Sequence, residues 1–360
     1  MTNMSNMKTA IIYPNNPFRI YKEDEWDSFR SEGRVPINIG FGLSLLDYDT
    51  NIIYNGWNIE NYKMTWNNIK LSKQPLLKKY DLALSFSNFN QLNAEFEKGL
   101  SIVYEKSHID RTMNYIKSTG NSNIHFVITH KDLIKLTEKQ IKRNVIYIPP
   151  LYPIPSINDG KGFIPCSFNP TLPELKVFLI YTSWSQNTTI GGDRFTYHEQ
   201  VVINHLKNKG YKVKLSILVE KREINCPLKF DNIETEFFYS NECNYKKIID
   251  LILNNDICIT NGASVFPGNC MTDIVTLGKP LIYICDGRFG IESTFNVNLL
   301  YSIKDNNIIY IQESDTNLIE SKVDKLLSNP IEICKTYKEI HKDQDINNWK
   351  NIVKKALNEL

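Results

Sequence analysis

The chain has 360 residues and a formal net charge of +2 at pH 7, and 42% of its residues are hydrophobic against 23% charged. These proportions exclude a disordered or fibrous chain, and the length is about right for two domains. The longest apolar runs are too short to span a membrane, and the N-terminus has no signal-peptide pattern. We therefore expect a cytoplasmic protein whose seven cysteines are reduced and mostly buried.

The first half of the chain alternates short apolar runs with helical patterns. Uninterrupted apolar strands separated by helices are typical of a parallel sheet covered on both faces. The spacing predicts helices over residues 111–117 and 131–142. The predicted strands are 9–13, 51–54, 81–85, 100–104, 124–128 and 145–148.

Prolines mark the place where the chain divides. Seven of the 15 lie between Pro149 and Pro173. Proline fixes φ and lacks an N–H donor, so this stretch cannot lie inside a helix or a central strand. We expect residues 153–173 to link an N-terminal domain, residues 1–152, to a second domain, residues 174–340.

The second half repeats the alternation more clearly and ends in an amphipathic segment, residues 341–360, which should form a helix packed on a domain. The fold class is therefore α/β, with two doubly wound, Rossmann-like domains facing a cleft. The predicted strands are 177–181, 212–219, 233–237, 256–260, 281–284 and 307–311, and the predicted helices are 197–209, 245–254, 269–277 and 316–327.

The most informative stretch follows the predicted strand that ends at Thr260. A loop of small residues comes next, and Gly268 and Asn269 then open a helix that closes at Gly278. Backbone N–H groups at this helix start suit a phosphate, because the helix dipole adds to their attraction. Asp273 lies one turn further in, where a carboxylate can accept hydrogen bonds from a ribose diol. The alternative is an ordinary strand–loop–helix in which Asp273 is only a first-turn charge.

This stretch resembles the second domain of GT-B glycosyltransferases, in which the donor-binding helix ends in a small-Gly-Lys/Arg-Pro turn. Many retaining members carry two acids, eight residues apart, ahead of that turn. Asp273 matches the second, ribose-binding acid, whereas the first falls on Val265, which cannot contact the transferred sugar. The retaining glycogen-synthase-like subgroup is therefore not supported, and CDP-glycerol transferases and the sialyl- and epimerase-like relatives stay open.

The resemblance implies a metal-independent glycosyltransferase with a nucleotide-diphosphate sugar as co-substrate, no other cofactor, and a C-terminal helix that crosses back to the first domain. Paired glycines let backbone approach a ligand, Arg194 offers a planar fork to phosphate, and Lys221 offers a point charge or is simply a solvated strand end. The implied donor-binding residues are Gly192, Arg194, Lys221, Gly262, Ser264, Gly268, Asn269 and Asp273.

The first domain would hold the acceptor. Gly40 and Gly42 are similar to the glycine-rich loop of the GT-B first domain, although the third glycine of a dinucleotide fingerprint is absent. In GT-B enzymes the end of the strand predicted here at 100–104 supplies a His or acid near the reacting carbon. His108 and Asp110 are therefore the candidates for a catalytic base or a sugar-positioning group, against a structural role for a lone histidine.

Charge gives one hint about the acceptor. The first 150 residues hold 19 Lys and Arg against 15 Asp and Glu, and residues 62–80 carry five lysines and Trp66 with no acid. Such a segment suits an anionic partner such as nucleic acid, a lipid-linked phosphate or teichoic acid, or it is a solvated face. The acceptor therefore stays open between a glycan, a lipid-linked phosphate and nucleic acid, and so does the choice between inversion and retention. The alternatives are a phage-type DNA-base glucosyltransferase, a nucleotide-sugar epimerase and a non-catalytic two-domain binding protein.

Overall fold

The chain folds as two compact units in a computed structural model. Unit 1 comprises Met1–Gly160 and Asp343–Leu360, and unit 2 comprises Lys161–Lys342. The predicted linker, residues 153–173, lies almost entirely outside the described residues. None of the helices in the described part of the chain combines the length and the apolar character that a membrane crossing requires. The structure describes residues 7–14, 34–53, 69–103, 106–128, 134–143, 145–148, 168, 173–181, 192–219, 228, 230–239, 242–243, 245–262, 269–285, 308–310, 314–335 and 346–360.

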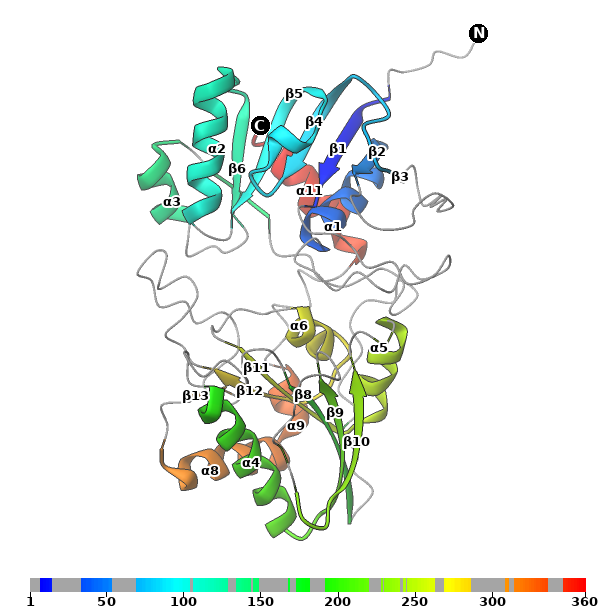
Figure 1. Cartoon of the computed structure of the whole chain (residues 1–360), viewed down its shortest axis with the longest axis vertical. Helices are drawn as coiled ribbons and strands as arrows, with labels where there is room; N and C mark the ends of the chain where they lie inside the picture. Colours follow the sequence, from blue (N-terminus) through cyan, green and yellow to red (C-terminus); the bar gives the residue numbers. More distant parts are fainter. Residues whose placement is uncertain are drawn as a thin grey trace. The chain divides into compact units, whose positions relative to one another are not determined.

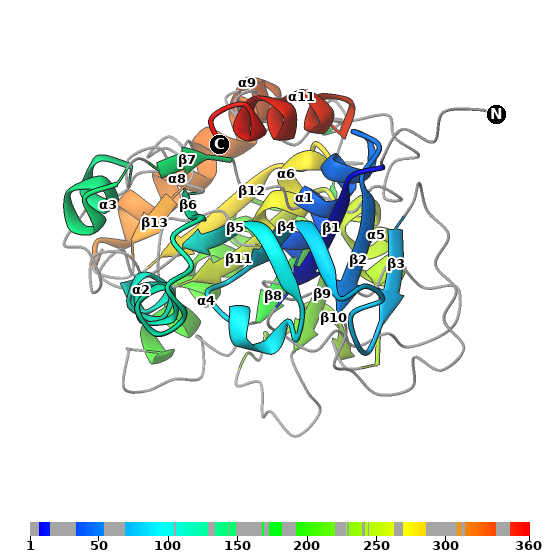
Figure 2. The same cartoon turned by 90° about the horizontal axis from the view of Figure 1, so that it is seen from above.

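Unit 1 is built on a parallel sheet with the strand order β3-β2-β1-β4-β5-β6-β7, and Figure 2 shows β3, β2, β1, β4 and β5 side by side in that order. The order reverses between β1 and β4, as in other doubly wound sheets. Its elements are β1 (Thr9–Tyr13), α1 (Arg34–Ser44), β2 (Asp49–Ile53), β3 (Ile69–Ser72), β4 (Lys79–Ser85), the 3₁₀ helix η2 (Phe89–Gln91), β5 (Glu95–Val103), α2 (Lys106–Thr119), β6 (Ile124–Ile128), α3 (Ile134–Ile141), β7 (Val145–Tyr147) and the C-terminal α11 (Ile346–Leu357).

Helix α11 packs against α1, so the predicted return of the C-terminal helix to the first domain is confirmed (Figure 1). Its apolar face is buried there through Trp349, Val353 and Ala356. A Cβ added at Gly42 of α1 would overlap the Val353 side chain. The two helices therefore approach closely because one of them carries a glycine at the contact.

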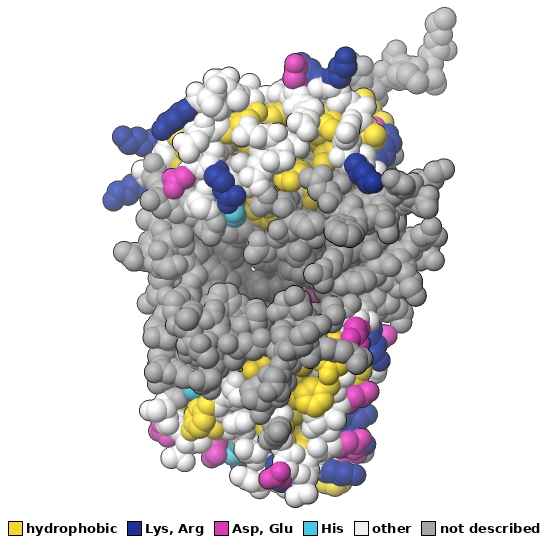
Figure 3. Space-filling view, in the orientation of Figure 1, with side chains coloured by type: hydrophobic (Ala, Val, Ile, Leu, Met, Phe, Trp, Pro, Cys, Tyr) yellow, Lys and Arg dark blue, Asp and Glu magenta, His cyan; other side chains and the backbone are white. Residues whose placement is uncertain are grey.

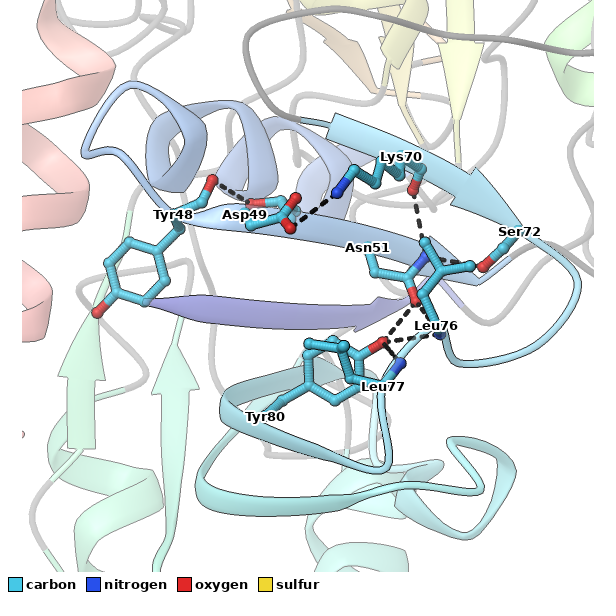
Figure 4. Close-up of polar contacts among 9 residues, drawn as sticks. Tyr48, Asp49, Asn51, Lys70, Ser72, Leu76, Leu77 and Tyr80 are labelled. Atoms are coloured by element: carbon cyan, nitrogen blue, oxygen red, sulfur yellow. Dashed lines mark hydrogen bonds and ion pairs between the residues drawn. The ribbon is translucent and has the colours of Figure 1, made fainter. Parts of the chain in front are cut away.

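A six-residue loop, residues 73–78, makes the crossover from β3 to β4 in place of a helix, and a buried polar network holds it (Figure 4). The Tyr80 hydroxyl accepts hydrogen bonds from the backbone N–H groups of Leu76 at 2.9 Å and Leu77 at 3.0 Å. It donates to Asn51 Oδ1 at 2.8 Å, and that oxygen also accepts from Leu76 N–H at 3.1 Å. The network therefore satisfies loop N–H groups that a helix would otherwise have paired.

Unit 2 is built on a second parallel sheet with the strand order β10-β9-β8-β11-β12-β13. Acidic and basic side chains lie next to one another on its described surface (Figure 3), as in the ion pairs of Lys214 with Glu174 and Glu234. Its elements are β8 (Glu174–Tyr181), α4 (Gly192–Asn208), β9 (Lys212–Val219), β10 (Glu234–Tyr239), α5 (Tyr245–Asn254), β11 (Ile257–Gly262), α6 (Asn269–Thr276), β12 (Leu281–Cys285), β13 (Ile308–Tyr310), α8 (Thr316–Ser328) and α9 (Pro330–Lys335).

Helices α4 and α8 lie side by side in unit 2 (Figure 1) and are joined by ionic groups. The buried His205 ring contacts Asp324 Oδ1 at 2.8 Å and Glu320 Oε2 at 3.5 Å, and Lys209 Nζ lies 2.9 Å from Asp324 Oδ2. Partial burial would raise the pKa of Asp324, but the hydrogen bonds from His205 and Lys209 outweigh it and hold that pKa below its ordinary value. His205 therefore belongs to a helix–helix contact.

The four cysteines with described side chains are free and buried, which agrees with the expectation of reduced thiols. They are Cys243, Cys258, Cys285 and Cys334. Burial raises the pKa of the Cys258 thiol to about 12. Both the burial and the raised pKa disfavour the thiolate, which is the reactive form.

Candidate functional site

The strand order of unit 2 reverses between β8 and β11. From β8 the chain runs outward through β9 to β10, and it then crosses to the other side of β8 to form β11, β12 and β13. The connections that leave β8 and β11 therefore diverge at the carboxyl edge of the sheet. In doubly wound sheets this switch point is where ligands bind.

Two helices begin after these strands, α4 after β8 and α6 after β11. Gly192 is the first residue of α4 and Arg194 the third, whereas the sequence placed both in a loop ahead of a helix at 197–209. Asn269 is the first residue of α6, as predicted. The N-terminal ends of both helices carry backbone N–H groups that lack partners within the helix, and these attract anions.

Asp273 lies in the second turn of α6, and its residue is 2% exposed. The end of the helix explains how the Gly-Lys-Pro turn works. Gly278 adopts a φ of +68°, and the N–H groups of Gly278 and Lys279 donate to the carbonyls of Val275 at 3.0 Å and Ile274 at 3.1 Å. This Schellman cap ends α6 and leads directly into β12. The turn therefore fixes the register of α6 and, with it, the place of Asp273.

The predicted loop of small residues is shorter than the sequence suggested. Strand β11 continues through Asn261 to Gly262, which pairs with Cys285 of β12, so Gly262 belongs to the sheet and its prediction as a loop residue is wrong. Lys221, Ser264 and Gly268 lie outside the described residues.

Two polar residues at this switch point were not predicted as a pair. The Asn261 Nδ2 group donates to Glu199 Oε1 of α4 at 2.5 Å, and both residues are buried, at 6% and 0% exposure. Asn261 was visible in the sequence only as the residue after a strand, and Glu199 only as one acid in a helical pattern. Their contact depends on the crossover from α4 to β11, which spans 62 residues.

In unit 1, His108 and Asp110 lie in helix α2, which begins at Lys106 soon after β5 ends at Val103. The helix begins five residues before the one predicted at 111–117. His108 is 9% exposed and its ring centroid lies 5.7 Å from that of Phe86, whereas Asp110 is exposed. Two residues apart on a helix with 3.6 residues per turn, the two side chains leave the helix in different directions.

A hydroxyl pair holds the first turns of α2 on β5. Thr112 Oγ1 donates to the His108 carbonyl at 2.8 Å and lies 2.6 Å from Ser101 Oγ, so Ser101 is the donor to Thr112. Nearby, Ser87 follows β4 with a φ of +70° and is buried. The carboxyl edge of the unit 1 sheet therefore carries buried polar groups around His108.

The predicted cleft loop at Gly40 and Gly42 is wrong, because both residues lie inside α1 and are buried. A Cβ at Gly40 would overlap the Ile12 side chain of β1, as one at Gly42 would overlap Val353. The glycines therefore serve close packing of α1 against the sheet on one side and against α11 on the other.

The basic segment, residues 62–80, is described from Ile69 onward, and two of its lysines there are paired with acids. Lys70 Nζ lies 2.8 Å from Asp49 Oδ2 (Figure 4), and Lys79 Nζ lies 2.9 Å from Glu97 Oε1. Lys63 and Trp66 lie outside the described residues. Among the described side chains, no group of three or more His, Cys, Asp or Glu is arranged to hold a metal ion.

The fold is that of GT-B glycosyltransferases. No protein-family model matches the chain, and no curated protein sequence does. Sucrose-phosphate synthase from Thermosynechococcus elongatus is 9% identical over 98% of each chain, with a TM-score of 0.53. The solved structure described as "Trehalose-6-phosphate from E. coli bound with UDP-2-fluoro glucose" is 9% identical over 98% of this chain and 99% of the other, with a TM-score of 0.51. Anabaena HepE in complex with UDP and glucose is 9% identical over 98% and 100%, also with a TM-score of 0.51. The architecture predicted from the resemblance is confirmed.

Proposed function

We propose that the chain is a glycosyltransferase that moves a sugar from a nucleotide-diphosphate sugar to an acceptor without a metal ion. The observation that carries the proposal is the switch point of unit 2, where α4 and α6 both begin at the carboxyl edge of the sheet. Helix starts at such a point bind phosphate groups. The structures with bound UDP-2-fluoro glucose and with UDP and glucose have the same fold.

In this proposal the donor binds to unit 2. The diphosphate lies at the starts of α4 and α6, and Asp273 binds the ribose. Arg194 stabilises the departing nucleoside diphosphate by a bidentate, charge-assisted contact, which replaces the charge that a metal ion would supply. Lys221 adds a second positive charge. The remaining donor-binding residues are Gly192, Gly262, Ser264, Gly268 and Asn269.

The acceptor binds to unit 1, and His108 or Asp110 removes its proton or positions the sugar. Ser101 and Thr112 support this role indirectly, because they hold the turn that carries His108 against β5. The acceptor class stays open between a glycan, a lipid-linked phosphate and nucleic acid.

A thermal-shift screen of UDP-, GDP-, CDP- and ADP-linked sugars tests the donor site. We expect one donor class to stabilise the wild type, and Arg194→Ala and Asp273→Ala to remove most of that shift, because each deletes a contact made by the ligand. Arg143→Ala is the matched control, since Arg143 is an exposed arginine of unit 1. Equal stabilisation of the wild type and both site variants would place the donor elsewhere.

The catalytic proposal is tested with the donor found in that screen and glycan, lipid-linked phosphate and DNA acceptors. Asp110→Asn or His108→Ala should leave donor binding intact and abolish transfer, measured as release of nucleoside diphosphate with chelator present. Unchanged turnover in both variants rejects these two residues. Loss of turnover on adding the chelator rejects metal independence.

The same assays separate the alternatives. Conversion of the donor sugar without any acceptor identifies an epimerase, and tight binding without nucleotide release identifies a binding protein. Transfer to duplex DNA together with binding that weakens steeply with salt identifies a DNA-base glucosyltransferase.

A further inference from the structure

The hydrogen bond between Glu199 and Asn261 joins the two chain segments that flank the switch point. Glu199 lies on α4, and Asn261 is the last residue but one of β11. The Asn261 Nδ2 to Glu199 Oε1 distance is 2.5 Å, and Glu199 has no exposed surface. Because a buried carboxylate is costly unless it accepts hydrogen bonds, the contact fixes both side chains.

The hydrogen bond fixes the orientation of the amide. Asn261 donates through Nδ2, so its nitrogen faces Glu199 and its oxygen faces away. Glu199 is the eighth residue of α4, which sets it back from the start of the helix by about 10 Å along the axis. The acid of the pair is therefore set back along α4, whereas the neutral amide lies at the carboxyl end of β11.

We propose that Glu199 is a positioning residue that holds Asn261 as a neutral hydrogen-bonding group at the edge of the donor site. The inference rests on the proposed function, because it concerns the anionic diphosphate of a nucleotide donor. The tether joins α4 to the last residues of β11, the two elements at which the proposed diphosphate site is built. A carboxylate at position 261 would repel the diphosphate, whereas the acid at position 199 is set back from it.

Exchanging the two groups separates this role from a purely structural one. Asn261→Asp places two carboxylates at hydrogen-bonding distance and should lower both the melting temperature and the affinity. In the double variant Glu199→Gln/Asn261→Asp, the glutamine nitrogen donates to the aspartate, so the hydrogen bond is restored while the acid has moved to the edge. Glu199→Gln alone is the matched control, because its amide oxygen still accepts from Asn261.

The probes are UDP, GDP, CDP and ADP, measured by titration calorimetry, with the matching uncharged nucleoside as a second ligand. We expect the double variant to regain most of the wild-type melting temperature, yet to bind the diphosphate about tenfold or more weakly. The affinity of the double variant for the uncharged nucleoside should stay within about threefold of wild type. The affinity of Glu199→Gln for the diphosphate should also stay within about threefold of wild type. Recovery of both stability and diphosphate affinity in the double variant overturns the inference and leaves the proposed function standing.

A measurement on the wild type guards against variants that do not fold. Nucleoside diphosphate should slow hydrogen exchange at the end of β11 and in the first two turns of α4 together, because the tether couples them. Binding without protection at either segment overturns the inference. Absence of binding by all four diphosphates rejects the proposed function, and the inference with it.

Discussion

The hydroxyl group of Tyr80 holds the short connection between β3 and β4. It makes three hydrogen bonds, and the Tyr80 residue is 2% exposed. Burial is the main reason that the pKa of Tyr80 is raised, so the hydroxyl stays protonated and can donate to Asn51. A loop whose N–H groups point at such an acceptor needs no helix to satisfy them.

Tyr80→Phe should lower the free energy of unfolding by about 1–2 kcal/mol, because it removes three hydrogen bonds and leaves the Asn51 oxygen and two loop N–H groups without this partner. Chemical denaturation measures the change. Tyr115→Phe is the control, since the Tyr115 hydroxyl makes no hydrogen bond among the described residues, and it should cost about 0.5 kcal/mol or less. Equal losses in both variants would show that the network contributes nothing.

At the scale of elements, helix α1 shows how packing overrides local preference. Each glycine costs an isolated helix about 1 kcal/mol relative to alanine, and α1 carries two. The helix forms because Gly40 and Gly42 allow close contact with β1 and α11. The close approach adds van der Waals contacts and buries apolar surface along the whole contact, including that of Trp349 and Val353.

Gly42→Ala should therefore destabilise unit 1 by about 1–2 kcal/mol, although alanine is the better helix former, because the new methyl group overlaps Val353. Val353→Ala removes the overlapping methyl groups. In a double-mutant cycle the two changes should couple by about 1 kcal/mol or more, with the double variant more stable than the sum predicts. Additive effects would place the strain elsewhere.

The same helix explains which elements the sequence predicts well. Strand β9 and helix α5 were predicted with the observed bounds, because apolar periodicity decides them and polar or glycine residues bound them. Helix α1 was missed because two glycines two residues apart are typical of a loop. Strand β3 was missed because its four residues lie in a lysine-rich segment and pair only at a sheet edge.

The placement of some candidate site residues in loops was wrong for a related reason. Gly192 is the second residue of a glycine pair, which is typical of a loop, yet α4 already begins at Gly192 and includes Arg194. The position of Asp273 in a helix could be predicted because the Gly-Lys-Pro turn fixes where that helix ends. Glu199 and Asn261 could not, because their meeting depends on a crossover between distant segments and no local pattern records it.

At the scale of the molecule, the order of the segments along the chain differs from their grouping into two compact units. Unit 1 takes residues from both ends of the chain, whereas unit 2 is continuous. The contact between α1 and α11 therefore joins two segments that the whole of unit 2 separates in the sequence.

Deleting residues 343–360 should weaken unit 1 selectively, because it exposes the face of α1 that α11 covers and removes the fully buried Trp349. Hydrogen exchange resolved by peptide is the measurement. Faster exchange is expected in α1, β1 and β2, with peptides of β8, β9 and α5 unchanged. Equally faster hydrogen exchange in both units, or unchanged exchange in both, would contradict the assignment of the tail to unit 1 alone.

The return of α11 also sets the order of events during synthesis. Helix α1 is synthesised long before Trp349, so α1 lacks its cover until nearly the whole chain has been made. The unit that begins first is thus the unit that is completed last. In engineering terms unit 2 is an insert between residues 160 and 343 of unit 1, so the two units are joined at two points of the chain.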